Sequence, residues 1–321
     1  MTGRTIWFLA AFGILVIGVA RVGAATFITA DLDVRYRYRG YTDHRVGVEG
    51  LGLGVRQVFA DTAGDRLTLF AFAQAWHDFN EVMLEQGYVQ YKGPMGAWAV
   101  SLGRFTVPFG LLPNYQTERL LLKTLEDVTL GMLTDSGAML SGVVHDFDYA
   151  VSFTQGIGVS GWRAVHGSGV ISGRLGWQGA DDTGVRLGVS AAYGATVPDT
   201  MHGGGHDTEH RVRERRLVAA DAIKYSGTRV FRAEITGGTV DAEPFFGAFW
   251  GVDFGVASAV DLSVGHRYVH HGPERAFAVT GGFSFNDIFG FQVRIAQEYF
   301  FIGEGAHEFT VQVYRAIAFS R

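Results

Sequence analysis

The chain has 321 residues, a formal net charge of −5, 45 glycines, 6 prolines and no cysteine. The lack of cysteine excludes disulfides, thiolate metal sites and attachment of a lipid or a haem at cysteine. The mildly acidic charge gives no reason to expect nucleic-acid binding. No linker, charge block or low-complexity stretch divides the sequence, so we expect one domain.

The first 25 residues have the order of a secretory signal peptide. Arg4 supplies a positive start, residues 6–20 are apolar, and residues 22–25 are small residues suited to cleavage. The apolar run is shorter than the roughly 20 residues of a membrane-spanning helix. We expect residues 1–25 to be removed, which takes the charge from −5 to −7 by loss of Arg4 and Arg21. The alternative is an uncleaved N-terminal anchor.

Residues 26–321 show a recurring alternation with a period of two. In "FQVRIAQEYFF" (291–301), Phe, Val, Ile and Tyr alternate with Gln, Arg, Ala and Glu. This pattern is typical of a strand with two different faces. The phase of two segments, 66–77 and 138–144, stays open, and at Gly103 a break in the alternation suggests a bulge. The sixteen segments are 27–40, 45–60, 66–77, 84–93, 97–107, 138–144, 147–156, 168–178, 184–194, 212–225, 228–238, 245–257, 259–270, 274–285, 290–302 and 306–319.

Sixteen amphipathic strands fit either a soluble sandwich or a transmembrane barrel. Many segments have ten or more residues, longer than strands of soluble sheets and near the length of strands in membrane barrels. A closed barrel also pairs every backbone group inside lipid. We therefore predict an all-β fold, a 16-stranded antiparallel transmembrane β-barrel. Aromatic residues near strand ends suit the girdle of such a barrel: Tyr36, Tyr38, Phe283, Phe285, Tyr299, Phe301 and Phe319.

The order of the strands assigns each connection to one side of the membrane. With the N-terminus in the periplasm, the short connections rich in Asp, Asn and Gly are periplasmic turns: 61–65, 93–95, 145–147, 179–184, 226–227, 258–259 and 286–290. The external set is 41–44, 78–83, 108–137, 157–167, 195–211, 239–244, 271–273 and 303–305.

The third external connection, 108–137, is long and has no clean alternation. A barrel of 16 strands encloses an aqueous channel, and a loop folded into it would narrow that channel. Residues 117–127 ("TERLLLKTLED") could form a short helix that starts at Thr117. A flexible external lid or a protein-contact loop is the alternative. The expected wall anchors are Leu111, Leu112, Leu120, Leu121, Leu122 and Leu125, and the residues expected to face the water path are Glu118, Arg119, Lys123, Glu126, Asp127 and Asp135.

The stretch "LGRFTVPFG" (102–110) resembles the G-[KR]-F-x-x-P-F-G stretch that precedes the constriction loop of the phosphate-selective (O/P type) porin family. Sixteen strands with the longest loop third also resemble the plan of general bacterial porins. The resemblance implies a trimeric, water-filled channel in a bacterial outer membrane. Phosphate selectivity does not follow, because those lumens are rich in lysine and this chain has only Lys92, Lys123 and Lys224.

The polar face of the alternation should line the pore. It carries arginines and acids, and rings of charge in a pore set the ion preference. We expect a weak anion preference; the alternative is that the arginines pair with the acids and only keep the wall polar. The predicted pore-lining residues are Arg35, Arg37, Arg56, Arg174, Arg186, Arg232, Arg267, Arg294, Asp253 and Glu298, and Asp31, Asp33, Asp221, Glu234 and Asp261 share their face.

Other candidate sites are weaker. His202, His206 and His210 stand four residues apart and could bind zinc or copper, but three successive glycines disfavour the helix that would align them. "HGGG" resembles an oxyanion loop without any GxSxG stretch. We expect no enzyme, no cofactor and no metal.

The sequence thus predicts an outer-membrane diffusion channel for small hydrophilic solutes and ions. Its expected partners are outer-membrane lipid, two further copies in a homotrimer and the solutes themselves. The alternative is a barrel that acts as a sheath or scaffold around a periplasmic partner, such as a multihaem cytochrome in an electron conduit. A barrel hydrolase is a third and weaker possibility.

Overall fold

The computed structural model describes residues 25–39, 43–62, 64–76, 81–114, 122–158, 167–179, 184–197, 212–301 and 306–320. The expected signal peptide lies outside the described residues. Among those residues, no helix has the length and apolar character needed to cross a membrane.

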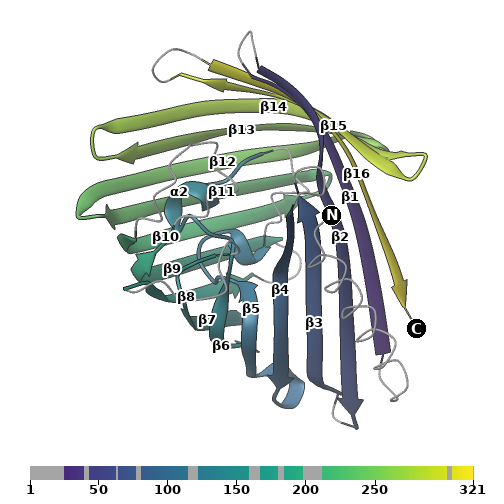
Figure 1. The fold of residues 1–321 in the computed structure, drawn as a ribbon, viewed down its shortest axis with the longest axis vertical. Coiled ribbons are helices and arrows are strands. Elements are labelled where there is room, and N and C mark those ends of the chain that lie inside the picture. Colours follow the sequence, from purple (N-terminus) through teal and green to yellow (C-terminus); the bar gives the residue numbers. More distant parts are fainter. Residues whose placement is uncertain are drawn as a thin grey trace.

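Sixteen antiparallel strands close into one barrel in which each strand pairs with its neighbours in sequence and β1 pairs with β16 (Figure 1). The expected fold class is thereby confirmed. The strands are β1 (Ala25–Arg39), β2 (Asp43–Asp61), β3 (Gly64–Trp76), β4 (Glu81–Lys92), β5 (Ala99–Thr106), β6 (Thr134–Val144), β7 (Phe147–Thr154), β8 (Gly169–Gln178), β9 (Val185–Thr196), β10 (Arg213–Ser226), β11 (Arg229–Val240), β12 (Glu243–Ala257), β13 (Val260–His271), β14 (Glu274–Ile288), β15 (Phe291–Phe300) and β16 (Ala306–Ser320).

In the described residues, three short helices lie between strands. The turn from β4 to β5 holds the 3₁₀ helix η1 (Pro94–Gly96), and the connection from β5 to β6 holds the 3₁₀ helix η2 (Leu112–Asn114) and α2 (Glu126–Thr129). Figure 1 shows this connection inside the barrel, with α2 beside the wall of β10–β12. We call the described part of residues 107–133 the inner loop.

The register identifies the inward face of every strand. Lys123 of the inner loop pairs with Glu298, so Glu298 faces the lumen, and Arg294 follows by alternation. Arg294 bonds to Gln312, and Gln312 bonds to Asp33 on β1. Directly paired residues share a face, so the assignment passes from strand to strand around the barrel.

The same register settles the two segments whose phase was open. On β3 the inward residues are Thr68, Phe70, Phe72 and Gln74, because they pair with Val58, Arg56, Gly54 and Gly52. On β6 the residues paired with inward Thr154 and Ser152 are Gly137 and Met139. The predicted girdle aromatics face outward; Tyr299, Phe301 and Phe319 are the most exposed of them.

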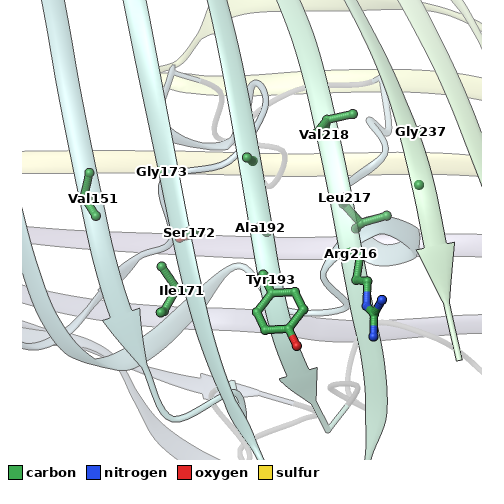
Figure 2. Close-up of a pocket in the computed structure, with 12 residues that line it drawn as sticks. Val151, Ile171, Ser172, Gly173, Ala192, Tyr193, Arg216, Leu217, Val218 and Gly237 are labelled. Atoms are coloured by element: carbon green, nitrogen blue, oxygen red, sulfur yellow. The ribbon is translucent and has the colours of Figure 1, made fainter. Parts of the chain in front are cut away.

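The outer wall is apolar, as a lipid-facing surface requires. Figure 2 shows one shallow groove on it, over β7–β11, where Val151, Ile171 and Val218 stand around Gly173 and Gly237. The Arg216 guanidinium lies 5.6 Å from the centre of the Tyr193 ring at one end of this groove. The groove therefore opens away from the lumen.

Two local expectations were wrong. At Gly103 the pairing of β5 with β4 and β6 continues without a shift of register, so the strand has no bulge there. Instead Gly103 has φ +126°, and a Cβ would lie 2.2 Å from the carbonyl oxygen of Gly87. Residues 122–125 are not helical, and α2 begins only at Glu126; the rest of the expected helix, 117–121, lies outside the described residues.

Candidate functional site

The inner loop packs against the inward face of one side of the barrel. Its apolar anchors Val107, Phe109, Leu111, Leu125 and Leu130 are each at most 1% exposed. They form one buried cluster with wall residues from β8–β13, which are Val170, Ala192, Leu217, Ala219, Ile223, Val240, Phe245, Phe249 and Val269. Leu112 and Leu122 belong to the same cluster, whereas Leu120 and Leu121 lie outside the described residues. Burial of apolar surface on this scale fixes the loop in the lumen.

Three glycines of β12 and β13 lie opposite Leu122 and Leu125. A Cβ at Gly251 would lie 2.5 Å from Leu122 Cδ1, and one at Gly247 would lie 3.1 Å from Leu125 Cδ1. Gly265 on the next strand also faces Leu122, at 3.2 Å. The small inward residues of β12 and β13 therefore make room for the loop.

The end of the "GRFTVPFG" stretch is the polar anchor of the loop. The Gly110 N–H donates to Ser190 Oγ at 3.0 Å, and the Leu111 N–H donates to Glu234 Oε2 at 2.9 Å. Gly110 has φ +55°, and a Cβ there would lie 2.7 Å from the Glu234 carboxylate. Glycine is thus required both by the left-handed backbone and by the close approach of the carboxylate.

Arg174 of β8 also binds this part of the loop. Its Nε donates to the Gly110 carbonyl at 3.1 Å, Nη2 pairs with Asp221 at 2.7 Å, and Nη1 pairs with Asp148 at 3.0 Å. The side chains of Arg174 and Asp221 are 4% and 1% exposed. Removal of either partner of this buried ion pair would destabilise the protein, because the remaining charge would be buried without a counter-charge.

Two more inward arginines bind loop carbonyls. Arg215 donates to the carbonyls of Val128 and Thr129 at the end of α2, and to Thr196 Oγ1 at 2.6 Å. Arg267 donates to the Thr124 carbonyl at 3.3 Å. The arginines of this wall therefore hold the backbone of the loop, a role that sequence analysis missed and for which Arg215 was not a candidate.

Lys123 extends the contacts of the loop to β15 and β16. Its Nζ lies 2.9 Å from Glu298 Oε2 on β15 and 3.0 Å from Glu308 Oε1 on β16. Here a cation of the loop, one of the residues expected to face the water path, meets acids of the wall. The reason is that the β15–β16 wall presents two neighbouring carboxylates, which a single ammonium group bridges.

The other predicted loop charges are distributed differently. Asp135 is fully buried at the start of β6, where it accepts hydrogen bonds from the N–H groups of Ser136 and Gly156, so it does not face water. Glu118 and Arg119 lie outside the described residues, as do the side chains of Glu126 and Asp127.

Most of the predicted pore-lining arginines have acidic partners in the wall. Arg35 pairs with Asp33 at 2.6 Å, Arg37 lies 3.4 Å from Glu49, and Arg267 lies 3.5 Å from Glu298. Arg232 pairs with Asp253, which also accepts from Ser263 at 2.6 Å. Arg294 is buried and donates to Gln312 and Gln292. These contacts favour the alternative in which the charges mainly keep the wall polar.

Arg56 and Arg186 differ from these. Both side chains are exposed on the inward face, and each guanidinium lies over an aromatic ring: Arg56 over Phe27 at 6.0 Å and Arg186 over Tyr225 at 5.7 Å. Neither makes an ion pair with a carboxylate in the described part of the chain. Of the predicted pore-lining arginines, these two are the best placed to meet a passing anion.

The structure shows no group of three or more His, Cys, Asp or Glu side chains suited to a metal ion within the residues it describes. His202, His206 and His210 lie outside those residues, so that metal site stays untested.

Comparison with solved structures gives the same architecture. The trimer form of OmpT from Vibrio cholerae superposes with a TM-score of 0.70 at 12% identity, covering 92% of this chain and 100% of that one. The anion-selective porin from Comamonas acidovorans gives 0.67 at 12% identity, over 92% and 99%. OprB from Pseudomonas putida gives 0.64 at 11% identity, over 95% and 97%. No family model and no curated protein matches the sequence.

At these identities the likeness establishes the fold alone, which is that of 16-stranded outer-membrane barrels. Each superposition covers nearly the whole of both chains.

Proposed function

We propose that the chain is an outer-membrane porin, a passive diffusion channel for small hydrophilic solutes and ions. The observation that carries the proposal is the inner loop, which lies within a closed barrel and is bound to one side of its wall by a buried apolar cluster. A barrel of 16 strands is wide enough to hold water, and a loop bound to one side narrows the lumen without filling it.

The resemblance to the phosphate-selective (O/P type) porins enters the proposal at the level of the loop. The stretch that carries the resemblance ends in Phe109 and Gly110, which hold the inner loop against β8–β11. This contact supports a constriction loop of the same kind. It gives no support to phosphate as the solute, because the described lumen is supplied with arginine rather than with lysine.

We assign the channel a weak anion preference. Arg56 and Arg186 support it as exposed inward cations without an acidic partner among the described residues. The remaining predicted arginines support only a weak effect, because their charge is largely compensated within the wall.

The proposal places the chain in a bacterial outer membrane, exported by residues 1–25 and assembled as a homotrimer with lipid around it. One structural neighbour is described as a trimer form, which supports this assembly. The proposal includes no catalysis. The inner loop also argues against the sheath alternative, because it occupies lumen space that a periplasmic cytochrome would need.

The test is a planar-bilayer measurement of the purified protein under a salt gradient. We expect steady conductance and a small reversal potential of anion sign. A folded, heat-modifiable barrel that does not conduct would contradict the channel, whereas a conducting pore with a reversal potential of cation sign would contradict only the anion preference.

A further inference from the structure

The inward face of β1–β4 carries aromatic rings at positions where a wet lumen wall is ordinarily polar. One cross-strand row runs Phe27, Arg56, Phe70, Tyr88, since Phe27 pairs with Arg56, Arg56 with Phe70, and Phe70 with Tyr88. We call these four residues the aromatic row. With strands about 4.8 Å apart, the row spans roughly 14 Å of the wall.

The rings lie close enough to form one surface. The Phe70 and Tyr88 ring centres are 5.3 Å apart, and the Arg56 guanidinium lies 6.0 Å from the centre of Phe27. Phe72 stands in the adjacent row over glycine: a Cβ at Gly52 would lie 2.6 Å from its ring. The wall therefore presents aromatic rings beside one cation.

This surface is open to the lumen. Phe27 is 39% exposed, Arg56 is exposed, and Phe70, Phe72 and Tyr88 are half-buried. Contact between apolar ring surface and water is unfavourable. A ligand that covers the rings removes this contact, and the resulting gain in free energy favours binding.

The charge of the row selects the ligand further. Unlike Arg174 or Arg35, Arg56 has no carboxylate within ion-pair distance among the described residues. Its planar fork of donors matches a carboxylate, and its charge opposes a cation. An inorganic anion would use Arg56 alone, and a neutral ring would use only the aromatic faces.

We propose that the aromatic row binds planar aromatic carboxylates, with the ring stacked against Phe70 and Tyr88 and the carboxylate on Arg56. This deepens the proposed function, on which it rests, by naming a solute class that the channel retains and passes.

The test is titration calorimetry of the folded, detergent-solubilised protein with three probes: benzoate, acetate and benzyl alcohol. Ring contacts of this kind correspond to roughly a twofold to tenfold gain in affinity. We therefore expect benzoate to bind at least about fivefold more tightly than either acetate or benzyl alcohol. Equal affinities for benzoate and acetate would overturn the proposal.

Two substitutions locate the site. Phe70→Leu keeps apolar volume but removes the ring, and should bring the affinity for benzoate close to that for acetate. Arg56→Gln should bring it close to that for benzyl alcohol. Folding of each variant is checked by heat-modifiable migration, and a benzoate affinity unchanged in both folded variants would overturn the proposal.

A matched control exists on the outer wall. Arg229 also lies over a ring, that of Phe254, at 6.0 Å, but it faces outward together with Phe231. Arg229→Gln and Phe231→Leu should leave benzoate affinity unchanged, and a loss equal to that of the inward variants would overturn the assignment. Binding by a protein that does not conduct would contradict the channel but keep the site; conduction without preference for benzoate would do the reverse.

Discussion

The two sides of the lumen wall share the same antiparallel strand pattern but carry different inward side chains. On β8–β13 the inward positions hold glycine, small apolar residues and buried charges, and the inner loop covers them. On β1–β4 some inward positions hold aromatic rings and the exposed Arg56 beside polar residues and glycine. Many inward residues of β8–β13 therefore bind the inner loop, whereas the aromatic rings and Arg56 of β1–β4 meet the lumen.

Arginine shows the difference most clearly. Arg174, Arg215 and Arg267 donate to carbonyls of the inner loop, so most of their hydrogen-bonding capacity is used within the protein. Arg56 and Arg186 donate to no loop carbonyl in the part of the chain that the structure describes, and each lies over an aromatic ring. An inward arginine is consequently a guide to ion preference only when its donors are free.

Among the substitutions that test this difference between the two sides, Arg174→Ala should have the largest effect on stability and conductance. Removal of Arg174 leaves the buried Asp221 carboxylate without its cation and the Gly110 carbonyl without its donor. Loss of one partner of a buried pair costs about 3–5 kcal/mol. We expect a lower temperature of heat-modifiable unfolding and a higher single-channel conductance. Arg186→Ala, which alters an exposed inward arginine, is the control and should change neither stability nor conductance by a comparable amount.

Leu125→Ala should weaken the covered side from within the loop. Leu125 is 0% exposed against Gly247, and deletion of a buried leucine side chain costs about 2–5 kcal/mol. Unfolding temperature and current noise are the measurements. Leu187→Ala on the lipid-facing wall serves as the control, since it leaves no internal cavity. Equal destabilisation by both variants would show that the loop is not packed in the lumen.

Gly110→Ala tests the polar anchor and should destabilise the protein less than the two substitutions above. The left-handed backbone disfavours a Cβ by roughly 1–2 kcal/mol, and the Cβ would also approach the Glu234 carboxylate at 2.7 Å. Gly281→Ala is the control because a Cβ there meets nothing within 4 Å. We expect thermal unfolding to separate the two variants; coincident curves would exclude a close Gly110–Glu234 contact.

Lys123→Gln should change selectivity more than stability. The substitution leaves Glu298 and Glu308 without the ammonium group that bridges them, so the lumen gains attraction for cations. We expect the reversal potential in a salt gradient to move toward cation sign, and the shift to shrink at high ionic strength. A shift toward anion sign would contradict the bridge.

The smallest effect is expected from Arg56→Gln combined with Arg186→Gln. The pair removes two exposed inward cations that lack acidic partners in the described chain, so the weak anion preference should be lost while conductance persists. Arg229→Gln on the outer wall is the control. An unchanged reversal potential in the double variant would assign the preference to other residues.

The alternation in the sequence was sufficient to predict the barrel, because a period of two and a strand length are local properties. It was not sufficient to predict which face of 66–77 points inward, because Phe70 and Phe72 are inward rings in a segment whose two faces are both apolar. Inward apolar residues such as Leu217, Ile223 and Phe249 were a signal of loop contact that we did not use.

The course of the inner loop could not be predicted in this way. It depends on contacts such as Leu111 with Glu234 and Lys123 with Glu298, which are 123 and 175 residues apart. The sequence indicated that leucines of 108–137 would meet the wall, and those described do so. It contained no local sign that Lys123 would pair with acids of β15 and β16.

The most direct test of the account is a cross-link between the loop and the wall. The chain has no cysteine, so Leu125→Cys with Gly247→Cys gives one thiol on each side of their contact. Dibromobimane, which fluoresces after it has joined two thiols, should react rapidly in the folded protein. Leu125→Cys with Gly237→Cys, whose second thiol lies in the outer groove (Figure 2), should not. Fluorescence in the first pair alone is the predicted result, and its absence there would contradict a loop bound within the lumen.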